Sequence, residues 1–354
     1  MSEESSGYVD ARLARFTKPQ HYDLHYSSID FDQNTFAGRV SILFKTIKSP
    51  TAFILSKRDG TNCIGMLLHA LDLHLDQARI EHLSCGNSRS LHLEADNFRY
   101  STVEQICRIE FPYDENSENV FVLGQSYKLT IDFHGVLNSN MQGLYRSSYK
   151  DRVGQEHFIA TTQFEPTDAR RALPCFDEPN LKATFCLSVT LPAEIPYSSM
   201  KCISNTPITS NQTIFEGEKK RFHRIVTFQK TPLMSTYLLA LVIGDFDSIS
   251  STSEITRIMT TVYTVPGKVN QGKFCLDVAS QCLDLYKDLF DVPYPLVKSD
   301  LLAIPDFAAG AMEVRFHGSL EHRLLNSFYF LLFSSYLFVF LELGMCYVSR
   351  SQGN

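Results

Sequence analysis

The stretch Tyr127-Lys-Leu-Thr-Ile-Asp-Phe133 alternates apolar with polar side chains. Successive side chains of an extended chain point to opposite faces, so this alternation predicts a β-strand with one buried face and one face in water. The same period of two occurs at 22–26, 40–44 and 185–189. Half-buried strands of this kind are typical of antiparallel sheets. No helical spacing of useful length precedes about residue 265, so we expect residues 12–247 to form an all-β domain, a twisted sandwich.

The pattern changes near Ser248. Apolar residues at steps of three and four predict a helix from roughly Asn270 to Asp291, which Pro293 ends. We expect strands before it at Arg257–Val265 and after it at Lys298–Ile304. The order strand, helix, strand differs from the all-β region, and we therefore place a domain boundary near Ser248.

Composition limits the class of protein. The chain has 354 residues, 44% of them hydrophobic, which is enough for more than one core and favours two domains. The net charge is −6 without a basic block, so nucleic acid is not expected as a partner. Residues 1–11 are polar and acidic, which predicts a disordered tail and no signal peptide. Nine cysteines without a Cys-x-x-Cys pair predict reduced thiols in a cytoplasmic protein, and Cys186, within an apolar strand pattern, is expected only to pack.

One stretch combines small residues with a carboxylate, namely Ile304-Pro-Asp-Phe-Ala-Ala-Gly-Ala-Met-Glu313. Small side chains let another backbone approach closely, and a carboxylate beside them can hold a cation. A peptide with a free amino terminus supplies both the extended backbone and the ammonium. Gln163 and Glu165 lie two apart on an extended segment, so both side chains can point into one cleft. The alternatives are a small-residue loop with an exposed acid and, for Glu165, a solvated acid before a proline turn.

Several blocks resemble one enzyme family. Gly310-Ala-Met-Glu313 resembles the first four residues of the Gly-Ala-Met-Glu-Asn signature of zinc aminopeptidases of the gluzincin type, and the preceding Ile304-Pro-Asp-Phe-Ala-Ala309 is similar to the puromycin-sensitive, aminopeptidase N-like branch. Further blocks of the resemblance, in the family's order, are Gly143-Leu-Tyr-Arg146, 162–179, 234–240 and Phe290-Asp-Val-Pro-Tyr-Pro295. Long motifs in the right order are more specific than any one alone.

This resemblance implies a mainly β fold. It implies a saddle-like antiparallel β-sandwich domain over residues 12–247. The start of an α+β thermolysin-like catalytic domain would follow over residues 248–313. It also implies a zinc metallo-aminopeptidase that removes amino-terminal residues from peptides.

The resemblance assigns substrate binding to Gln163, Glu165, Gly310, Ala311, Met312 and Glu313. Glu165 and Glu313 would hold the substrate ammonium, and Gln163 would line the pocket for the first side chain. Two carboxylates around one ammonium form charge-assisted hydrogen bonds, and they repel each other when the site is empty, so such a site favours a cation.

The sequence departs from the family after Glu313. Val314 stands where the signature has asparagine, and the zinc motif His-Glu-x-x-His does not occur. His317 and His322 resemble an inverted zinc motif that is one residue too long. Zinc is the family's cofactor, but we expect no metal ligands, no catalytic residues and no bound zinc in this chain, and hence no hydrolysis. The alternative function is a non-catalytic or regulatory module that binds the amino terminus of peptides.

Residues 314–354 are expected to form a divergent, apolar, helical tail. Ser327–Leu341 carries no charge but falls short of the ~20 residues that span a bilayer. Three interpretations compete: a substitute carboxyl end from alternative splicing or a faulty gene model, a membrane anchor through residues 324–348, and a buried helix. We favour the first, which does not exclude the second. Membrane association is therefore the alternative to a cytoplasmic location.

Charged residues gather around Leu173-Pro-Cys-Phe176. We expect ion pairs there that hold a loop at the domain junction. The set comprises Asp168, Arg170, Arg171, Asp177 and Glu178, with Tyr145 and Arg146 in the same structural role.

Overall fold

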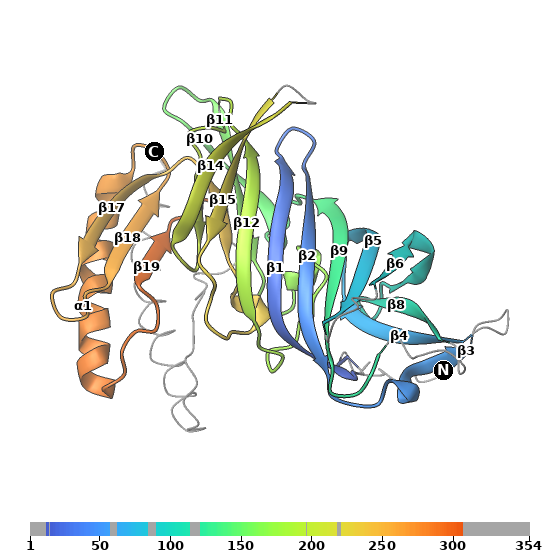
Figure 1. The fold of residues 1–354 in the computed structure, drawn as a ribbon. Helices are drawn as coiled ribbons and strands as arrows, with labels where there is room; N and C mark the ends of the chain where they lie inside the picture. Colours follow the sequence, from blue (N-terminus) through green and yellow to red (C-terminus); the bar gives the residue numbers. More distant parts are fainter. Residues whose placement is uncertain are drawn as a thin grey trace, which may run out of the picture.

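The structure is a computed structural model that describes residues 12–13, 15–56, 62–83, 90–113, 121–195, 197–217 and 221–306. This part of the chain is mainly β, as the sequence predicts. The largest sheet has the strand order β14-β15-β12-β1-β2-β9-β5-β6 (Figure 1). Its strands are β1 Thr17–Asp30, β2 Thr35–Thr46, β5 Leu73–His82, β6 Ser90–Glu94, β9 Ser126–Val136, β12 Thr184–Pro192, β14 Ile208–Glu216 and β15 Arg221–Phe228.

Smaller sheets flank this one. One has the order β3-β4-β8-β7, with β3 Ile54–Ser56, β4 Asn62–His69, β8 Ile106–Tyr113 and β7 Phe98–Ser101. Another has the order β10-β11-β16-β13, with β10 Gly143–Lys150, β11 Glu156–Gln163, β16 Leu241–Gly244 and β13 Lys201–Ser204. The last consists of β17 Asp247–Thr252, β18 Met259–Thr264 and β19 Lys298–Leu302. The described helices are α1 Lys273–Phe290 and the 3-10 turns η1 Pro50–Phe53, η2 Ala95–Asn97, η3 Ala169–Arg171, η4 Thr236–Leu238 and η5 Val269–Gly272.

Strand β9 lies inside the largest sheet because its buried side chains are in register with the buried side chains of both neighbouring strands. Leu129 is opposite Ile42 of β2 and Ile80 of β5, and all three are buried. A shift of one residue would turn every apolar side chain of β9 to the solvent face, so burial sets this register.

Most pairs in the largest sheet are antiparallel, as the alternation predicts, but β1 and β12 are parallel. A parallel pair needs a long crossover between its strands, and here more than 150 residues of chain separate β1 from β12. β18 and β19 are also parallel, joined through α1. The expectation of antiparallel sheets in residues 12–247 is therefore wrong at the pair β1–β12.

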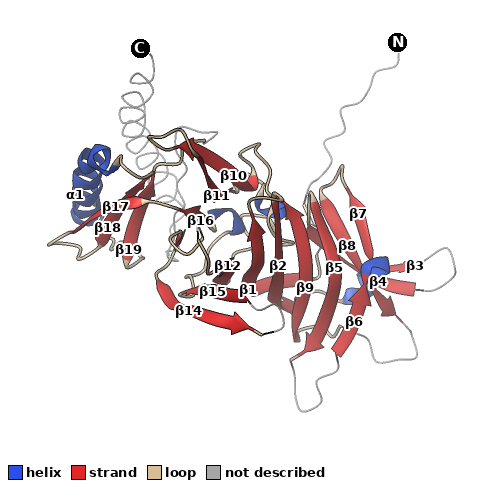
Figure 2. Cartoon of the chain, turned by 90° about the horizontal axis from the view of Figure 1, so that it is seen from above, coloured by secondary structure: helices blue, strands red, loops and turns tan. Residues whose placement is uncertain are grey.

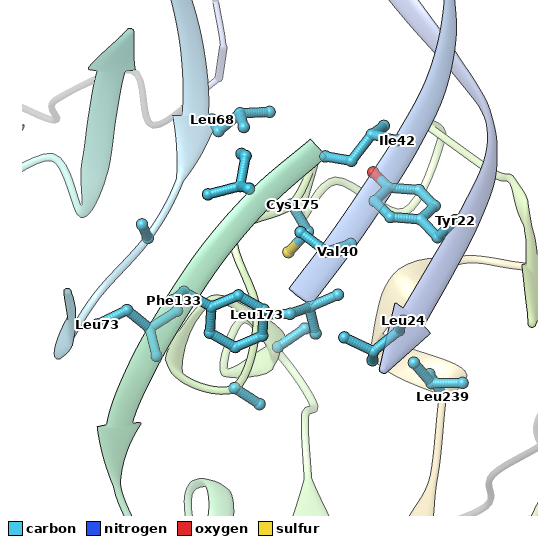
Figure 3. Packing of buried hydrophobic residues seen from close by; sticks show 14 of the residues in the cluster. Tyr22, Leu24, Val40, Ile42, Leu68, Leu73, Phe133, Leu173, Cys175 and Leu239 are labelled. Atoms are coloured by element: carbon cyan, nitrogen blue, oxygen red, sulfur yellow. The ribbon is translucent and has the colours of Figure 1, made fainter. Parts of the chain in front are cut away.

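The core lies on the inner face of the largest sheet (Figure 3). Tyr22 of β1 stacks on Phe185 of β12 with ring centroids 4.8 Å apart. The loop that follows β11 covers this face with Leu173 and Cys175, which Figure 3 shows among the side chains of the sheet. The Tyr26 hydroxyl donates to the carbonyl of Ala172 at 3.1 Å, which ties the loop to β1. Burial of large aromatic side chains such as these contributes about 25 cal/mol per Å² of apolar area.

Helix α1 and strands β17–β19 form the end of the molecule opposite to β3, β4 and β8 (Figures 1 and 2). The expected helix and its two flanking strands are confirmed. The helix begins at Lys273, after the 3-10 turn η5, and Asp291 ends it in a left-handed conformation. Leu276 and Leu283 of the predicted apolar stripe are buried.

A second apolar cluster joins residues from both sides of the boundary placed near Ser248: Ile159, Ile203, Val242, Phe246 and Val265. The division into domains at that residue stays a prediction. Within the described residues, no helix combines the length and the apolar content needed to cross a bilayer. Residues 314–354, with the predicted helical tail, lie outside the described residues.

Candidate functional site

Gln163 and Glu165 lie at the end of β11, where the sheet meets the loop that covers the core. Gln163 is opposite Gly143, the first residue of β10. Its side chain is 8% exposed, and its Nε2 donates to the carbonyl of Glu165 at 3.4 Å. Its Oε1 is buried and has no hydrogen-bond partner among the described residues. The structure therefore leaves one buried acceptor at the end of the strand. The expectation that the side chains of Gln163 and Glu165 point into one cleft stays a prediction.

The turn after Glu165 is held by hydrogen bonds. The peptide bond between Glu165 and Pro166 is cis. The amide of Asp168 donates to the carbonyl of Phe164 at 2.8 Å. The Asp168 carboxylate accepts from Nε of Arg171 at 2.8 Å, and the same guanidinium pairs with Asp72. These contacts hold the backbone of the turn that follows Glu165 in place.

A buried ion pair anchors the same loop further along. Arg170 and Asp177 are each 4% exposed, with Nε and Oδ2 3.0 Å apart. Burial raises the pKa of the Asp177 carboxyl above its usual value, and the Arg170 guanidinium opposes that rise. Glu178 accepts from Arg15 at 2.6 Å. The expectation that these charges form structural ion pairs is confirmed.

Asp306 fastens the last described segment to β10. Its carboxylate Oδ2 accepts from the Ser147 hydroxyl and from the Ser148 amide, each at 3.0 Å. Its backbone carbonyl accepts from the Tyr145 hydroxyl at 2.7 Å. Tyr145 is fully buried, which fits the structural role expected of it. No sequence pattern pairs Asp306 with Ser147, and this contact was missed; its one signal was the position of Asp306 within the block 304–309.

We expect Asp306→Ala to release this attachment. The variant loses both hydrogen bonds to Oδ2, each about 1–2 kcal/mol because the acceptor is charged. Limited proteolysis should then cut the chain after Leu302 sooner than in the unaltered protein. Asp300→Ala is the control, because it removes a different carboxylate of this segment, the one paired with Lys298. It tests whether the loss of any acidic side chain here speeds the cleavage. Equal cleavage rates in Asp306→Ala and the unaltered chain would contradict the prediction.

The other expected binding residues, Gly310, Ala311, Met312 and Glu313, lie outside the described residues, as do His317 and His322. The assignment of these positions stays a prediction. The described chain ends at Asp306, which is held beside the strand that pairs with β11.

A zinc site needs several histidine, cysteine or carboxylate ligands close together. One group of three potential ligands brings its donor atoms within 4.8 Å of one another, His21, Asp23 and Cys186. It lies on the outer face of the largest sheet, because the alternate β1 residues Leu24 and Tyr26 point inward. It lacks the two histidines and glutamate of the family's zinc site, so the described residues do not fit the catalytic metal, and we derive no step through it.

Comparison with known proteins identifies the family. The model of the peptidase M1 N-terminal domain matches residues 18–238, and that of the peptidase family M1 domain matches residues 274–324. The second match continues past Glu313, where the motifs quoted above end.

Curated relatives agree with both matches. The chain is 40% identical to aminopeptidase M1-C of Oryza sativa subsp. japonica over 304 residues, which are 86% of this chain and 30% of the relative. It is 38% identical to aminopeptidase M1 of Arabidopsis thaliana over 305 residues, again 86% of this chain and 30% of the relative. It is 37% identical to puromycin-sensitive aminopeptidase of Caenorhabditis elegans over 302 residues, 85% of this chain and 28% of the relative. The chain thus spans about 30% of the length of these relatives, and it belongs to the peptidase M1 family.

Proposed function

We propose that this chain binds the free amino terminus of peptides with Gln163, Glu165 and Glu313. An aminopeptidase must hold this end of the peptide in order to remove its amino-terminal residues. The observation that carries the proposal is the buried Oε1 of Gln163, which has no partner among the described residues. An unpaired buried acceptor costs about 1–3 kcal/mol, and a bound donor would recover that cost.

The donors of an ammonium match this site. An ammonium has three N–H bonds and no acceptor. Carboxylates at Glu165 and Glu313 would accept two of them in charge-assisted hydrogen bonds, and the Gln163 Oε1 would accept the third. Gln163 would also form part of the wall around the first side chain of the peptide.

The length of the chain permits Glu313 to join them. Asp306 is held at Ser147, and Gly143, opposite Gln163, lies four residues away along β10. Four residues of a strand cover about 13 Å. The seven peptide units from Asp306 to Glu313 can span about 23 Å when extended. Glu313 is therefore within reach of the end of β11.

Glu165→Gln tests this proposal. We expect the variant of the full chain to bind a short peptide with a free amino terminus at least about tenfold more weakly, because a hydrogen bond to a charged group contributes about 1.5–3 kcal/mol. Calorimetric titration with the free peptide and its amino-acetylated form measures the effect. Glu156→Gln, at the exposed start of the same strand, is the matched control and should bind normally. Equal affinity for the free and the acetylated peptide would refute the proposal.

The proposal extends to the reaction. The 354 residues contain no His-Glu-x-x-His sequence, so we propose that by themselves they bind peptides without hydrolysing them. Release of a fluorophore from an aminoacyl substrate, abolished by Glu165→Gln, would overturn this part.

We also propose a cytoplasmic location, with attachment to membranes through residues 324–348 as the competing outcome. The support is that no disulfide joins the described cysteines, which fits a reducing compartment. Recovery of the chain in the pellet after carbonate extraction of membranes would favour attachment.

A further inference from the structure

Three potential metal ligands meet where β1 and β12 run side by side in the largest sheet (Figure 1). In this parallel pair, His21 is opposite Thr184 and Asp23 is opposite Cys186. Their side chains point away from the core, because Tyr22 and Phe185 between them point into it. His21 and Cys186 are half-buried and Asp23 is exposed, so the group is reachable from solvent. The expectation that Cys186 only packs stays a prediction, and its side chain is half-buried on this face.

Thr184 can set the tautomer of the His21 ring. Its hydroxyl lies 3.3 Å from the carbonyl of Gln20, which can only accept. The same Oγ1 lies 2.7 Å from Nδ1 of His21 and accepts from it in the tautomer that carries the proton on Nδ1. In that tautomer of the neutral ring, Nε2 has a free lone pair. Metal-binding histidines are held in the same way by a hydrogen bond to their second nitrogen.

That lone pair faces a second acceptor. Nε2 of His21 lies 3.1 Å from Oδ1 of Asp23. When the proton is on Nδ1, a lone pair faces a carboxylate oxygen at this distance, and a positive charge between them removes the repulsion. The charge can be a proton, which makes His21 an imidazolium, or a metal ion that both atoms bind. Two ligands about 2.0–2.1 Å from a tetrahedral ion lie about 3.3 Å apart, close to the observed distance.

Cys186 favours the metal ion over the proton, because a proton shared by His21 and Asp23 would involve no thiol. The Cys186 sulfur completes a set of nitrogen, oxygen and sulfur donors, all within 4.8 Å of one another. If all three residues bound one ion, the Cys186 sulfur would move about 1 Å nearer to the other two donor atoms, since zinc–sulfur bonds are about 2.3 Å. We propose that His21, Asp23 and Cys186 bind one zinc-like divalent ion on the outer face of the largest sheet, with water as the fourth ligand.

The donor set favours an ion of intermediate softness. Imidazole and thiolate suit zinc and cobalt, whereas magnesium and calcium prefer oxygen alone. The ammonium groups of Lys128 and Lys230 lie close enough to act on Asp23, and they weaken the attraction for any cation. The site is separate from the proposed peptide site, so the failure of one leaves the other standing. It revises the sequence-based expectation that this chain binds no metal.

His25 provides a matched control on the same strand and face. Its Nδ1 lies 2.8 Å from the Ser188 hydroxyl and its Nε2 lies 3.2 Å from the Thr190 hydroxyl. Both ring nitrogens thus contact hydroxyl groups, and among the described residues no carboxylate or thiol is bonded to them. An ion that needs only an accessible histidine would bind both residues alike, whereas the proposed site requires His21.

Cobalt titration of the untagged full chain, stripped of metal and kept reduced without thiols, tests the proposal. We expect one equivalent of Co²⁺ to produce a thiolate-to-cobalt charge-transfer band, which an equivalent of Zn²⁺ then removes. Cys186→Ser and His21→Gln should lose the band, while Cys282→Ser and His25→Gln should keep it. Thr184→Val should weaken Co²⁺ binding about tenfold, as loss of an orienting partner does, and Thr184→Ser should restore it.

A second measurement on the unaltered chain covers the case in which a variant fails to fold. Zn²⁺ should slow the alkylation of Cys186 by iodoacetamide at least tenfold, as measured on the peptide that contains it, and should leave alkylation of Cys282 unchanged. Absence of the band in the unaltered chain, its persistence in Cys186→Ser, or unprotected alkylation of Cys186 would overturn the proposal.

Discussion

Arg170→Leu is expected to lower the free energy of unfolding by about 3–5 kcal/mol, because it leaves the buried Asp177 carboxylate without its partner. The guanidinium also donates to the Gln105 side chain at 3.0 Å, and that acceptor is lost as well. Urea unfolding of the full chain, followed by far-ultraviolet circular dichroism, measures the change. Arg39→Leu removes an exposed ion pair with Asp132 in the largest sheet and should cost less than about 1 kcal/mol.

The effect of Arg170→Leu should depend on pH. Burial raises the pKa of Asp177 even beside Arg170, and without the guanidinium the pKa rises further. A carboxyl whose folded pKa lies above its unfolded value stabilises the fold when protonated, and this contribution is lost as the pH rises through the folded pKa. The variant should therefore recover stability on acidification from neutral pH. Replacing both partners with leucine should also restore part of the loss; equal stability losses in the single and double variants would contradict this account.

Gly143→Ala is expected to lower the free energy of unfolding by about 2–4 kcal/mol, combining left-handed backbone strain with overpacking. Gly143 has φ +70°, and a Cβ there would lie 2.6 Å from Cβ of Arg171 and 3.3 Å from the carbonyl of Asp168. Relief of that overlap would displace Arg171, which holds the turn carrying Glu165. The variant should therefore also bind free-amino peptides more weakly, which calorimetric titration measures.

Gly154→Ala separates the two causes of this loss. Gly154 has φ +88°, and a Cβ there would meet nothing within 4 Å. The control therefore carries the backbone cost alone, about 1–2 kcal/mol, and should leave peptide affinity unchanged. Equal losses of stability in the two variants would show that the approach of Arg171 to Gly143 is unimportant.

The sequence by itself determined the local elements. The alternation at 127–133 predicted β9, and the apolar stripe between Asn270 and Asp291 predicted α1. It also determined the family, because ordered motifs and the match over residues 18–238 agree. The local elements follow from periods of two and about 3.6 residues, because a strand or helix with these periods can bury one face. The ion pairs around Leu173 could also be predicted from the sequence, since charged residues beside apolar ones are buried only when they are paired.

Only the tertiary structure decided which distant residues meet. The parallel pairing of β1 with β12 puts Cys186 beside Asp23, and the attachment of Asp306 to Ser147 joins residues 159 positions apart. Periodicity states which face of a strand is buried but does not name the neighbouring strand. The choice of neighbour depends on how the whole chain packs around its core. Several strands have the same alternation of apolar and polar residues and could pair with a given strand, but the packed interior accepts one arrangement.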